Sequence, residues 1–297
     1  MNNLEIQNLN LMKERENFIK YLDVSELTLN TYKNGISSFL EYLNINDIKK
    51  PTRDNFRDFR EYLKGNKSIN TINGYMTAIR CFFKYLEANG IYNNITKEVK
   101  SLKYSTTPTT QVLSEKQCQE IYKNLTDKRE KCLWSLAITT GLRANEIALA
   151  KIENIKIYNG ETVLFVKCKK RDDESEYVKI STQVLKDIKD YIGDRNQGNI
   201  FISNSNHNKG NGVTNKTIRL IVKNILKRNG IEQDWVSVHT LRRTMATISY
   251  NNGQDIVAIQ QVLHQHSIAT TRRYLNQTTR DNNKLEYSVS NILLGGD

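Results

Sequence analysis

The sequence predicts a mainly helical protein of two domains, with one small antiparallel sheet in the second domain. Apolar residues recur at helical spacing from Glu14 to about Asn94, a pattern that predicts a small bundle of about four helices. Further along the chain, an Asn-Gly dipeptide between short apolar runs predicts a β-hairpin. With 297 residues, the chain is also longer than a typical single domain.

Local start and stop signals bound the first domain. Pro51 and Thr52 are typical of a helix start after a short loop, and Gly90 is typical of a helix end. The stretch around Pro108 is polar, as expected of an extended linker. The expected divisions are an N-terminal domain, a linker and a C-terminal domain, over residues 1–96, 97–112 and 113–297.

The second domain is predicted to combine helices with three short strands. Asn159-Gly160 supplies the two positive-φ positions of a tight type I′ turn. The expected strands cover residues 155–158, 161–169 and 177–181. The expected helices cover residues 131–140, 144–152, 182–191, 214–228, 239–250 and 255–263, with a short apolar run at 199–203. Thr270 is expected to begin a further short helix that carries Tyr274.

The charge balance indicates a polyanionic partner, with nucleic acid as the leading candidate. The chain has 44 Lys and Arg against 32 Asp and Glu, which gives a formal net charge of +12. Charge alone is equally compatible with a role in solubility.

Cysteine usage and hydropathy place the chain in a reducing cytoplasm. Its cysteines lie far apart, without the paired spacing of a zinc site or of a secreted disulfide framework: Cys81, Cys118, Cys132 and Cys168. The first twenty residues are polar and no run of eighteen apolar residues occurs, so neither a signal peptide nor a membrane span is expected.

Two arginine-containing segments are suited to phosphate binding. Arg143 follows a helix-ending glycine, and Glu146 could hold its guanidinium in place; an ordinary surface ion pair is the alternative. His239 and Arg242 share one face of the first turn of a helix, where N–H groups favour an anion. A capping histidine beside a solvated arginine is the alternative there.

Tyr274 is one of fifteen tyrosines, and on its own it would be read as a half-buried aromatic residue. Together with two arginines and a histidine it suits the attack of a tyrosine hydroxyl on a phosphodiester. Guanidinium groups neutralise the charge that develops on the phosphoryl oxygens, and a neighbouring imidazole moves protons.

Three motifs, in this order and with these gaps, resemble those of the tyrosine site-specific recombinases, the family of phage integrases and Xer proteins. They are Gly-Leu-Arg-Ala-Asn-Glu, His-Thr-Leu-Arg-Arg-Thr and Ser-Ile-Ala-Thr-Thr-Arg-Arg-Tyr, which end at Glu146, Thr244 and Tyr274. Residues 28–32 and 39–43 resemble the N-terminal core-binding domain of that family. The resemblance covers nearly the whole chain and implies a SAM-like helical bundle followed by a recombinase catalytic domain.

The resemblance implies a role for each matched residue. Tyr274 would be the nucleophile that becomes joined to a DNA 3′ phosphate, Arg143 and Arg242 would clamp the phosphate oxygens, and His239 would handle the tyrosine proton. The family also has a hairpin lysine that protonates the departing 5′ oxygen. Lys167, Lys169 and Lys170 compete for this role, and Lys169, just before the turn, matches best; a DNA-backbone or solvent-facing lysine is the alternative.

One departure from the family pattern precedes the tyrosine. The family commonly has Leu-Gly-His with the histidine nine residues before the nucleophile, whereas this chain has Gln265 there, His264 in the glycine position and His266 one place late. Gln265 can still donate a hydrogen bond to a phosphate oxygen. A one-residue adjustment could instead present His264 or His266. A metal site at this pair is not expected, because no carboxylate or cysteine lies nearby.

The resemblance implies site-specific cutting and rejoining of double-stranded DNA through a 3′-phosphotyrosyl bond and a Holliday junction, without metal, ATP or another cofactor. Resolution of dimers or cointegrates, and integration or excision of a mobile element, are both compatible with it. The expected partners are DNA, a second protomer on each site, a tetramer in the synapse and accessory proteins. The apolar C-terminal tail is expected to pack on a neighbouring protomer, with packing on its own domain as the alternative.

Two other functions remain open at this point. One is a catalytically silent DNA-binding protein on the same scaffold, in which Gln265 marks decay of the site. The other is a type IB topoisomerase, which shares the tyrosine chemistry but relaxes supercoils.

Overall fold

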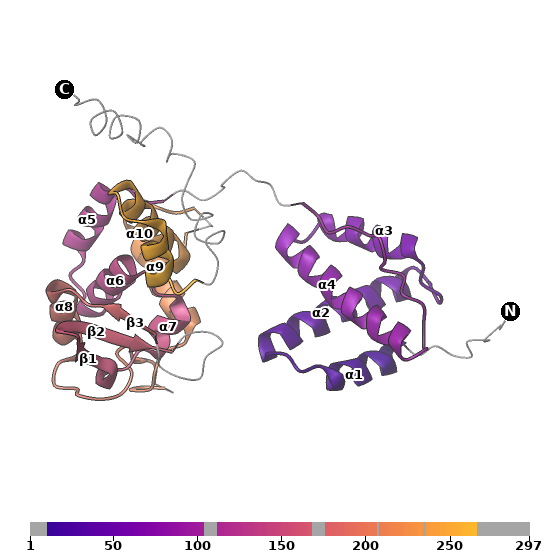
Figure 1. Cartoon of the computed structure of the whole chain (residues 1–297), viewed down its shortest axis with the longest axis horizontal. Coiled ribbons are helices and arrows are strands. Elements are labelled where there is room, and N and C mark those ends of the chain that lie inside the picture. Colours follow the sequence, from indigo (N-terminus) through magenta and orange to yellow (C-terminus); the bar gives the residue numbers. More distant parts are fainter. Residues whose placement is uncertain (1–10, 104–111, 168–175, 207, 234–235, 266–297) are drawn as a thin grey trace, which may run out of the picture. The chain divides into compact units, whose positions relative to one another are not determined.

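The computed structural model describes residues 11–103, 112–167, 176–206, 208–233 and 236–265. The chain divides into two compact units, Met1–Thr106 and Thr107–Asp297. The predicted fold class is confirmed, because most described elements are helices and a three-stranded antiparallel sheet lies in the second unit (Figure 1). Within the described ranges, no helix is both long enough and apolar enough to cross a bilayer.

The described part of the first unit is a bundle of four helices, as predicted. They are α1 (Leu11–Tyr21), α2 (Glu26–Ile45), α3 (Arg53–Lys64) and α4 (Ile69–Ala88). Hydroxyl side chains at Ser25, Thr52 and Ser68 accept hydrogen bonds from the first turns of α2, α3 and α4. These caps satisfy N–H groups that lack an intrahelical partner. Helix α3 begins directly after Pro51 and Thr52, as predicted.

Helices α2 and α4 make the most extensive contact in the first unit (Figure 1). Gly35 of α2 allows this close approach, since a Cβ atom there would lie 2.9 Å from the Cα of Tyr75. Buried phenylalanine rings fill the space beside the crossing, with the Phe39 and Phe59 centroids 5.1 Å apart. Edge-to-face rings of this kind bury large apolar areas in a favourable geometry.

The chain after α4 packs back on α3 and α4. The amide of Asn73 donates to the Leu102 carbonyl and accepts from the Leu102 N–H, both at 2.9 Å. Arg80 donates to the Val99 carbonyl at 2.8 Å. The packed part of the first unit thus extends into the stretch predicted as linker, and the domain bounds themselves stay a prediction.

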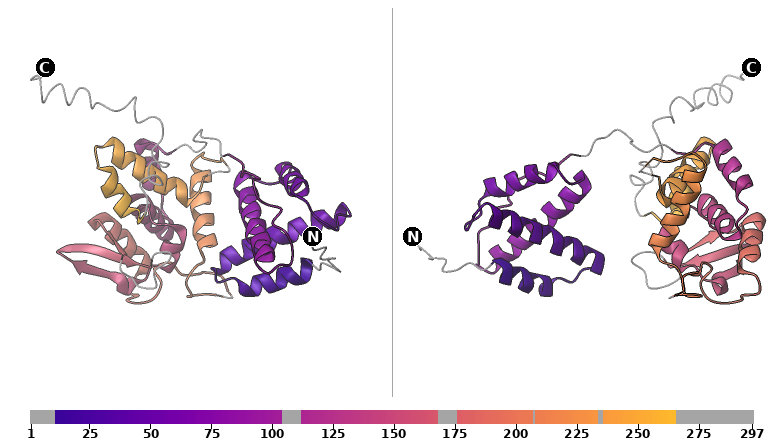
Figure 2. Two further views of the ribbon diagram at one scale, coloured as in Figure 1. Left: turned by 45° about the vertical axis from the view of Figure 1, so that its right-hand side comes forward. Right: turned by 180° about the vertical axis from the view of Figure 1, so that it is seen from behind.

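The second unit combines a helical core with a sheet at the end of the unit opposite α5 (Figures 1 and 2). Its first elements are α5 (Glu115–Asn124), α6 (Lys128–Thr140), α7 (Ala144–Leu149), a 3₁₀ turn (Ile152–Asn154), β1 (Ile155–Tyr158) and β2 (Glu161–Val166). The later elements are β3 (Glu176–Lys179), α8 (Thr182–Ile192), α9 (Asn215–Arg228), α10 (Val238–Asn251) and α11 (Ile256–Val262). Helix α6 packs against α5, α8, α9 and α10 and buries Trp134 completely.

The three strands form the predicted antiparallel sheet in the order β1-β2-β3. Asn159 and Gly160 take φ values of 50° and 79°, as the predicted tight turn requires. Leu164 of β2 pairs with Ile155 on one side and Val178 on the other. The predicted end of the second strand, at Lys169, lies outside the described residues.

Two features of the second unit differ from the predictions. Helix α5, which the periodicity did not single out, begins at a capping box formed by Ser114 and Gln117. The helix predicted over residues 144–152 ends at Leu149, because Ala150 is extended and its carbonyl accepts from the Ile200 N–H at 2.8 Å. This long-range backbone pairing competes with continued helix.

Candidate active site

Gly141 ends α6 and begins the site. It has φ of 62°, and its N–H donates to the Ala137 carbonyl at 3.1 Å. A Cβ atom here would lie 2.9 Å from both Leu263 Cδ2 and Met245 Cε. Glycine is required because the position combines left-handed backbone with close approach of α10 and the end of α11.

Arg143 begins α7 and is held by a buried carboxylate. Its Nη1 donates to Glu146 Oε1 at 2.6 Å, and its backbone N–H donates to Glu146 Oε2 at 2.8 Å. The Glu146 side chain is 3% exposed and the Arg143 side chain 30% exposed. The pair is therefore more than an ordinary surface ion pair: a buried acid fixes a guanidinium that still reaches solvent.

Arg242 is buried and joins three segments. Its exposed fraction is 1%. Its Nη1 donates to the Gly141 carbonyl at 2.6 Å, and its Nη2 donates to the Leu263 carbonyl. The guanidinium of α10 thus ties the end of α6, two residues before Arg143, to the end of α11. The alternative of a solvated arginine at this position is wrong.

His239 lies in the first turn of α10, where Ser237 caps the helix and accepts from the His239 N–H at 3.2 Å. Its side chain is exposed, yet the protein around the imidazole partly desolvates it. This desolvation is the largest cause of a lowered pKa for His239. The positive charges of nearby arginines lower the pKa further, in the order Arg242, Arg219, Arg143 and Arg243. His239 and both predicted arginines therefore share one electrostatic neighbourhood.

The segment after α11 carries two of the three alternatives for the position nine residues before Tyr274. Gln265 is 8% exposed, and its backbone is held by Gln260: the Gln265 N–H donates to the Gln260 carbonyl at 3.1 Å, and the Gln260 amide donates to the Gln265 carbonyl at 2.7 Å. His264 instead lies against β3, with Nε2 3.3 Å from the Tyr177 carbonyl oxygen.

Several predicted site residues fall outside the described residues. They are Tyr274, Lys169, Lys170 and His266, together with the Thr270 helix start and the apolar tail. Lys167 is the last described residue before that gap and is exposed. The roles assigned to all of these residues stay predictions.

Helix α9 carries a basic stripe that the sequence analysis missed. Lys216, Arg219, Lys223 and Lys227 are exposed and lie three, four and four residues apart, so they share one face. The helix contains no acidic residue. This one-sided charge is the sequence feature from which the stripe could have been predicted. The charge of Arg219 acts on His239, so this part of the stripe lies near the site.

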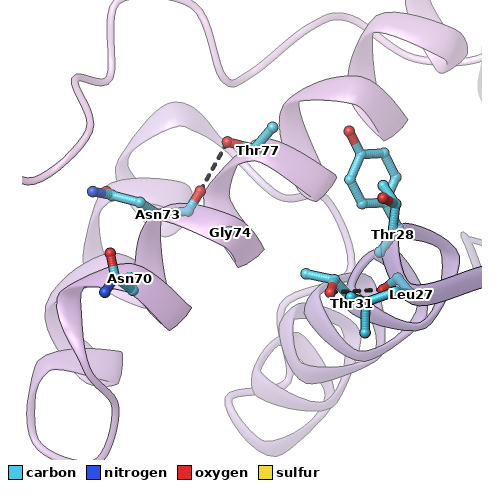
Figure 3. A pocket seen from close by; sticks show the side chains of 8 residues that line it. Leu27, Thr28, Thr31, Asn70, Asn73, Gly74 and Thr77 are labelled. Carbon is cyan, nitrogen blue, oxygen red and sulfur yellow. Dashed lines mark hydrogen bonds between the residues drawn. The ribbon is translucent and has the colours of Figure 1, made fainter. Parts of the chain in front are cut away.

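A second candidate surface lies in the first unit between α2 and α4 (Figure 3). It is an open groove of about 450 Å³ lined by Leu27, Thr28, Thr31, Tyr32, Asn70, Asn73, Gly74 and Thr77. Thr31 and Thr77 donate to the carbonyls of Leu27 and Asn73, at 3.0 Å and 2.8 Å. The exposed amide of Asn70 can both donate and accept, as contacts to base edges require.

The lowered pKa of His239 predicts a specific pH dependence. The imidazole should titrate below its ordinary value of 6.5 in the free protein and be neutral at pH 7. Because the unfolded chain then binds the proton more readily, this group should lower stability as pH falls through about 6.5. A bound phosphate should raise the pKa by offsetting the arginine charges.

An NMR titration of the imidazole resonances, with His239→Gln to assign the signal, measures this pKa. A His239 midpoint at or above 6.5 in the free protein would contradict the electrostatic neighbourhood described above.

Comparison with known proteins gives a family match in each of the two units. Residues 111–280 match the model of the phage integrase family, and residues 16–90 match that of the phage integrase N-terminal SAM-like domain. Tyrosine recombinase XerC of Staphylococcus aureus (strain JH9) is 26% identical over 305 residues, which cover 96% of this chain and 95% of the relative.

Two solved structures show the same fold. XerH site-specific recombinase bound to palindromic difH substrate, in a post-cleavage complex, has a TM-score of 0.71 at 21% identity and covers 98% of this chain and 91% of that one. A lambda integrase dimer bound to a COC′ core site has a TM-score of 0.75 at 17% identity, with coverages of 94% and 81%. The family match spans more than half of the chain, so the protein belongs to the phage integrase family and is a tyrosine recombinase.

Proposed function

We propose that this tyrosine recombinase cuts and rejoins duplex DNA at a specific site, with Tyr274 as the nucleophile. The observation that carries the proposal is that the charges of Arg143 and Arg242 act on His239, while Glu146 holds Arg143 and two backbone carbonyls hold Arg242. Tyr274 lies within the residues that match the family.

Each residue has a distinct role in the first step. The phenolic oxygen of Tyr274 bonds to the scissile phosphorus as the bond from phosphorus to the 5′ oxygen breaks. The phenolic proton passes to His239, whose lowered pKa leaves it neutral and able to accept at pH 7. Lys169 supplies a proton to the departing 5′ oxygen.

The remaining groups stabilise charge on the phosphate. The guanidinium groups of Arg143 and Arg242 donate to its nonbridging oxygens, which carry more charge in the transition state than in the substrate. Gln265 donates a further hydrogen bond in the position where the family commonly has a histidine. None of these roles requires a metal ion.

Two surfaces bind the duplex. The stripe of α9 contacts phosphates beside the site through Lys216, Arg219, Lys223 and Lys227. The groove between α2 and α4 supplies amide and hydroxyl groups in the first unit (Figure 3). The net charge of +12 strengthens both contacts.

Rejoining follows when a 5′ hydroxyl of a partner duplex attacks the phosphotyrosyl bond and releases Tyr274. Repeating the exchange on the other strand pair passes through a Holliday junction. This series of steps requires a dimer on each site and a tetramer in the synapse, and it takes place on cytoplasmic DNA. Dimer or cointegrate resolution and element integration use the same chemistry. Accessory proteins would set the direction of recombination.

The test is recovery of DNA attached covalently to the expressed protein in EDTA, for wild type and Tyr274→Phe. The wild-type adduct should survive denaturation, map to the Tyr274 peptide by mass spectrometry, and yield the target sequence. Tyr274→Phe should bind DNA without forming an adduct. An adduct in both proteins, or one that EDTA abolishes, would contradict the proposal, and no adduct in either would favour a silent DNA-binding protein.

The recovered sequence then separates recombination from topoisomerase activity. Two differently labelled duplexes should exchange strands if the protein is a recombinase. Relaxation of a supercoiled target without such exchange would favour the type IB alternative.

A further inference from the structure

The chain leaves α11 through a tight turn that backbone hydrogen bonds close. The His264 N–H donates to the Gln261 carbonyl at 2.9 Å, and the Gln265 N–H donates to the Gln260 carbonyl at 3.1 Å. His264 has a φ of 46°, in the left-handed region. These two bonds and the left-handed residue form a Schellman motif, which ends a helix through backbone atoms alone.

Gln260 adds a side-chain bond that this motif does not need. Its Nε2 donates to the Gln265 carbonyl oxygen at 2.7 Å. Gln260 therefore holds the Gln265 backbone at both the N–H and the carbonyl. Gln260 is partly buried and Gln265 is 8% exposed, so water competes little for this bond. The carbonyl contact restricts the backbone of Gln265 and leaves the helix end unchanged.

The turn is fixed to the phosphate-binding side of the site. The Leu263 carbonyl accepts from Arg242. Leu263 Cδ2 would lie 2.9 Å from a Cβ atom at Gly141, so the end of α11 packs directly on the end of α6. Gln265 follows two residues after Leu263. A restraint on the Gln265 backbone therefore restricts where its side chain can lie relative to Arg242.

We propose that Gln260 is a positioning residue that holds Gln265 in place for its contact with the scissile phosphate. The inference rests on the proposed function, in which the Gln265 amide donates to a nonbridging oxygen. Gln260 acts through Gln265 and makes no contact with the phosphate. A donor that is aimed before the substrate arrives needs no reorganisation in the transition state. Loss of the Gln260 amide should therefore slow cleavage while changing the fold little.

The test is a double-mutant cycle between Gln260 and Gln265, on DNA that carries the sequence recovered from the covalent adduct. Single-turnover cleavage at saturating DNA gives the rates of wild type, Gln260→Met, Gln265→Ala and the double variant. Methionine has a similar length and helix propensity but no donor. If Gln260 acts through Gln265, its amide should affect the rate only in proteins that retain the Gln265 side chain.

The expected rates follow from these roles. Gln265→Ala should cleave about 100-fold more slowly than wild type, the loss typical of one oxyanion donor. Gln260→Met should cleave about tenfold more slowly, because Gln265 is present but less well placed. In the Gln265→Ala background, Gln260→Met should change the rate by less than about twofold. DNA affinity should match wild type, since the contact strengthens in the transition state.

Two further variants separate positioning from a structural effect. Gln261→Met is the matched control, because it makes the same change at an exposed neighbour in α11 and keeps the backbone bonds; it should cleave at the wild-type rate. Gln260→Lys keeps a donor at the end of a long side chain and should cleave within about threefold of wild type. Each thermal midpoint should lie within about 4 °C of wild type, since no variant loses more than one hydrogen bond.

Two results would overturn the inference while Gln265→Ala remains slow: cleavage by Gln260→Met at the wild-type rate, or equal slowing by this substitution with and without the Gln265 side chain. Wild-type cleavage by Gln265→Ala would overturn it as well, by removing the role on which it rests. Failure of the proposed function is distinct, because wild type would then form no Tyr274 adduct. If Gln260→Met does not fold, Gln260→Asn takes its place in the cycle, since its amide is on a shorter side chain.

Discussion

Replacing Arg143 with alanine is expected to slow strand cleavage by about 10³-fold, the loss typical of removing one preorganised donor from a developing oxyanion. The structure gives a reason for so large an effect. The guanidinium reaches solvent at the surface of the site while Glu146, 3% exposed, holds it from behind. It therefore needs little reorganisation when a phosphate arrives.

The alanine variant also leaves the buried Glu146 carboxylate without its guanidinium, so part of the loss could come from folding. Arg143→Lys separates the two effects, because an ammonium can still neutralise Glu146 but cannot make two parallel hydrogen bonds to a phosphate. It should cleave about 10²-fold more slowly than wild type with stability within about 1 kcal/mol.

Single-turnover cleavage at saturating DNA measures the effect of both Arg143 variants. Arg228→Ala is the matched control, since this α9 arginine also pairs with a carboxylate, that of Glu130, but is 59% exposed. Cleavage by the control should match wild type. Cleavage by Arg143→Lys at the wild-type rate would show that this guanidinium does not stabilise the transition state.

Replacing Arg242 with alanine is expected to remove both activity and stability. The side chain is buried, and its loss would leave the carbonyls of Gly141 and Leu263 without these donors and a space where three segments meet. Unsatisfied buried acceptors and a new cavity together should lower the free energy of unfolding by about 3–5 kcal/mol. Cleavage should fall by at least about 10²-fold.

Tryptophan fluorescence measures the loss of stability in the second unit alone. Both tryptophans, Trp134 and Trp235, belong to the second unit, so denaturant unfolding followed by their emission reports on the part that contains Arg242. Arg242→Lys fills most of the space but reaches fewer carbonyls, and its midpoint should lie between those of wild type and Arg242→Ala. A wild-type midpoint for the alanine variant would mean that the two carbonyl contacts carry no stability.

The contrast between the two arginines shows where sequence reasoning stops. Motif order and spacing select both residues as candidates for the proposed phosphate contacts. Nothing in the local sequence distinguishes the 1% exposure of Arg242 from the partial exposure of Arg143. That difference arises from carbonyls that lie 101 residues before Arg242 and 21 residues after it.

Local chemistry likewise predicted some elements and missed others. Asn159-Gly160 specified its turn, and Thr52 specified a helix start, because each needs only neighbouring backbone atoms. The end of α7 depends on pairing of Ala150 with Ile200, which no local pattern contains. The packing of His264 on Tyr177 is of the same kind, since 87 residues separate them.

The contacts of Arg242 also bear on when the protein becomes able to cut DNA during its synthesis. Proteins emerge from the ribosome from the N-terminus, and domains generally fold as units in that order. The first unit and the residues around Gly141 are made long before Arg242 and Leu263, which fix the guanidinium across 101 and 21 residues. A nascent chain can thus complete its first unit before Arg242, one of the two arginines proposed to bind the phosphate, has been made. Under the proposed roles, cleavage competence follows the synthesis of Arg242 and Leu263 and does not accompany folding of the first unit.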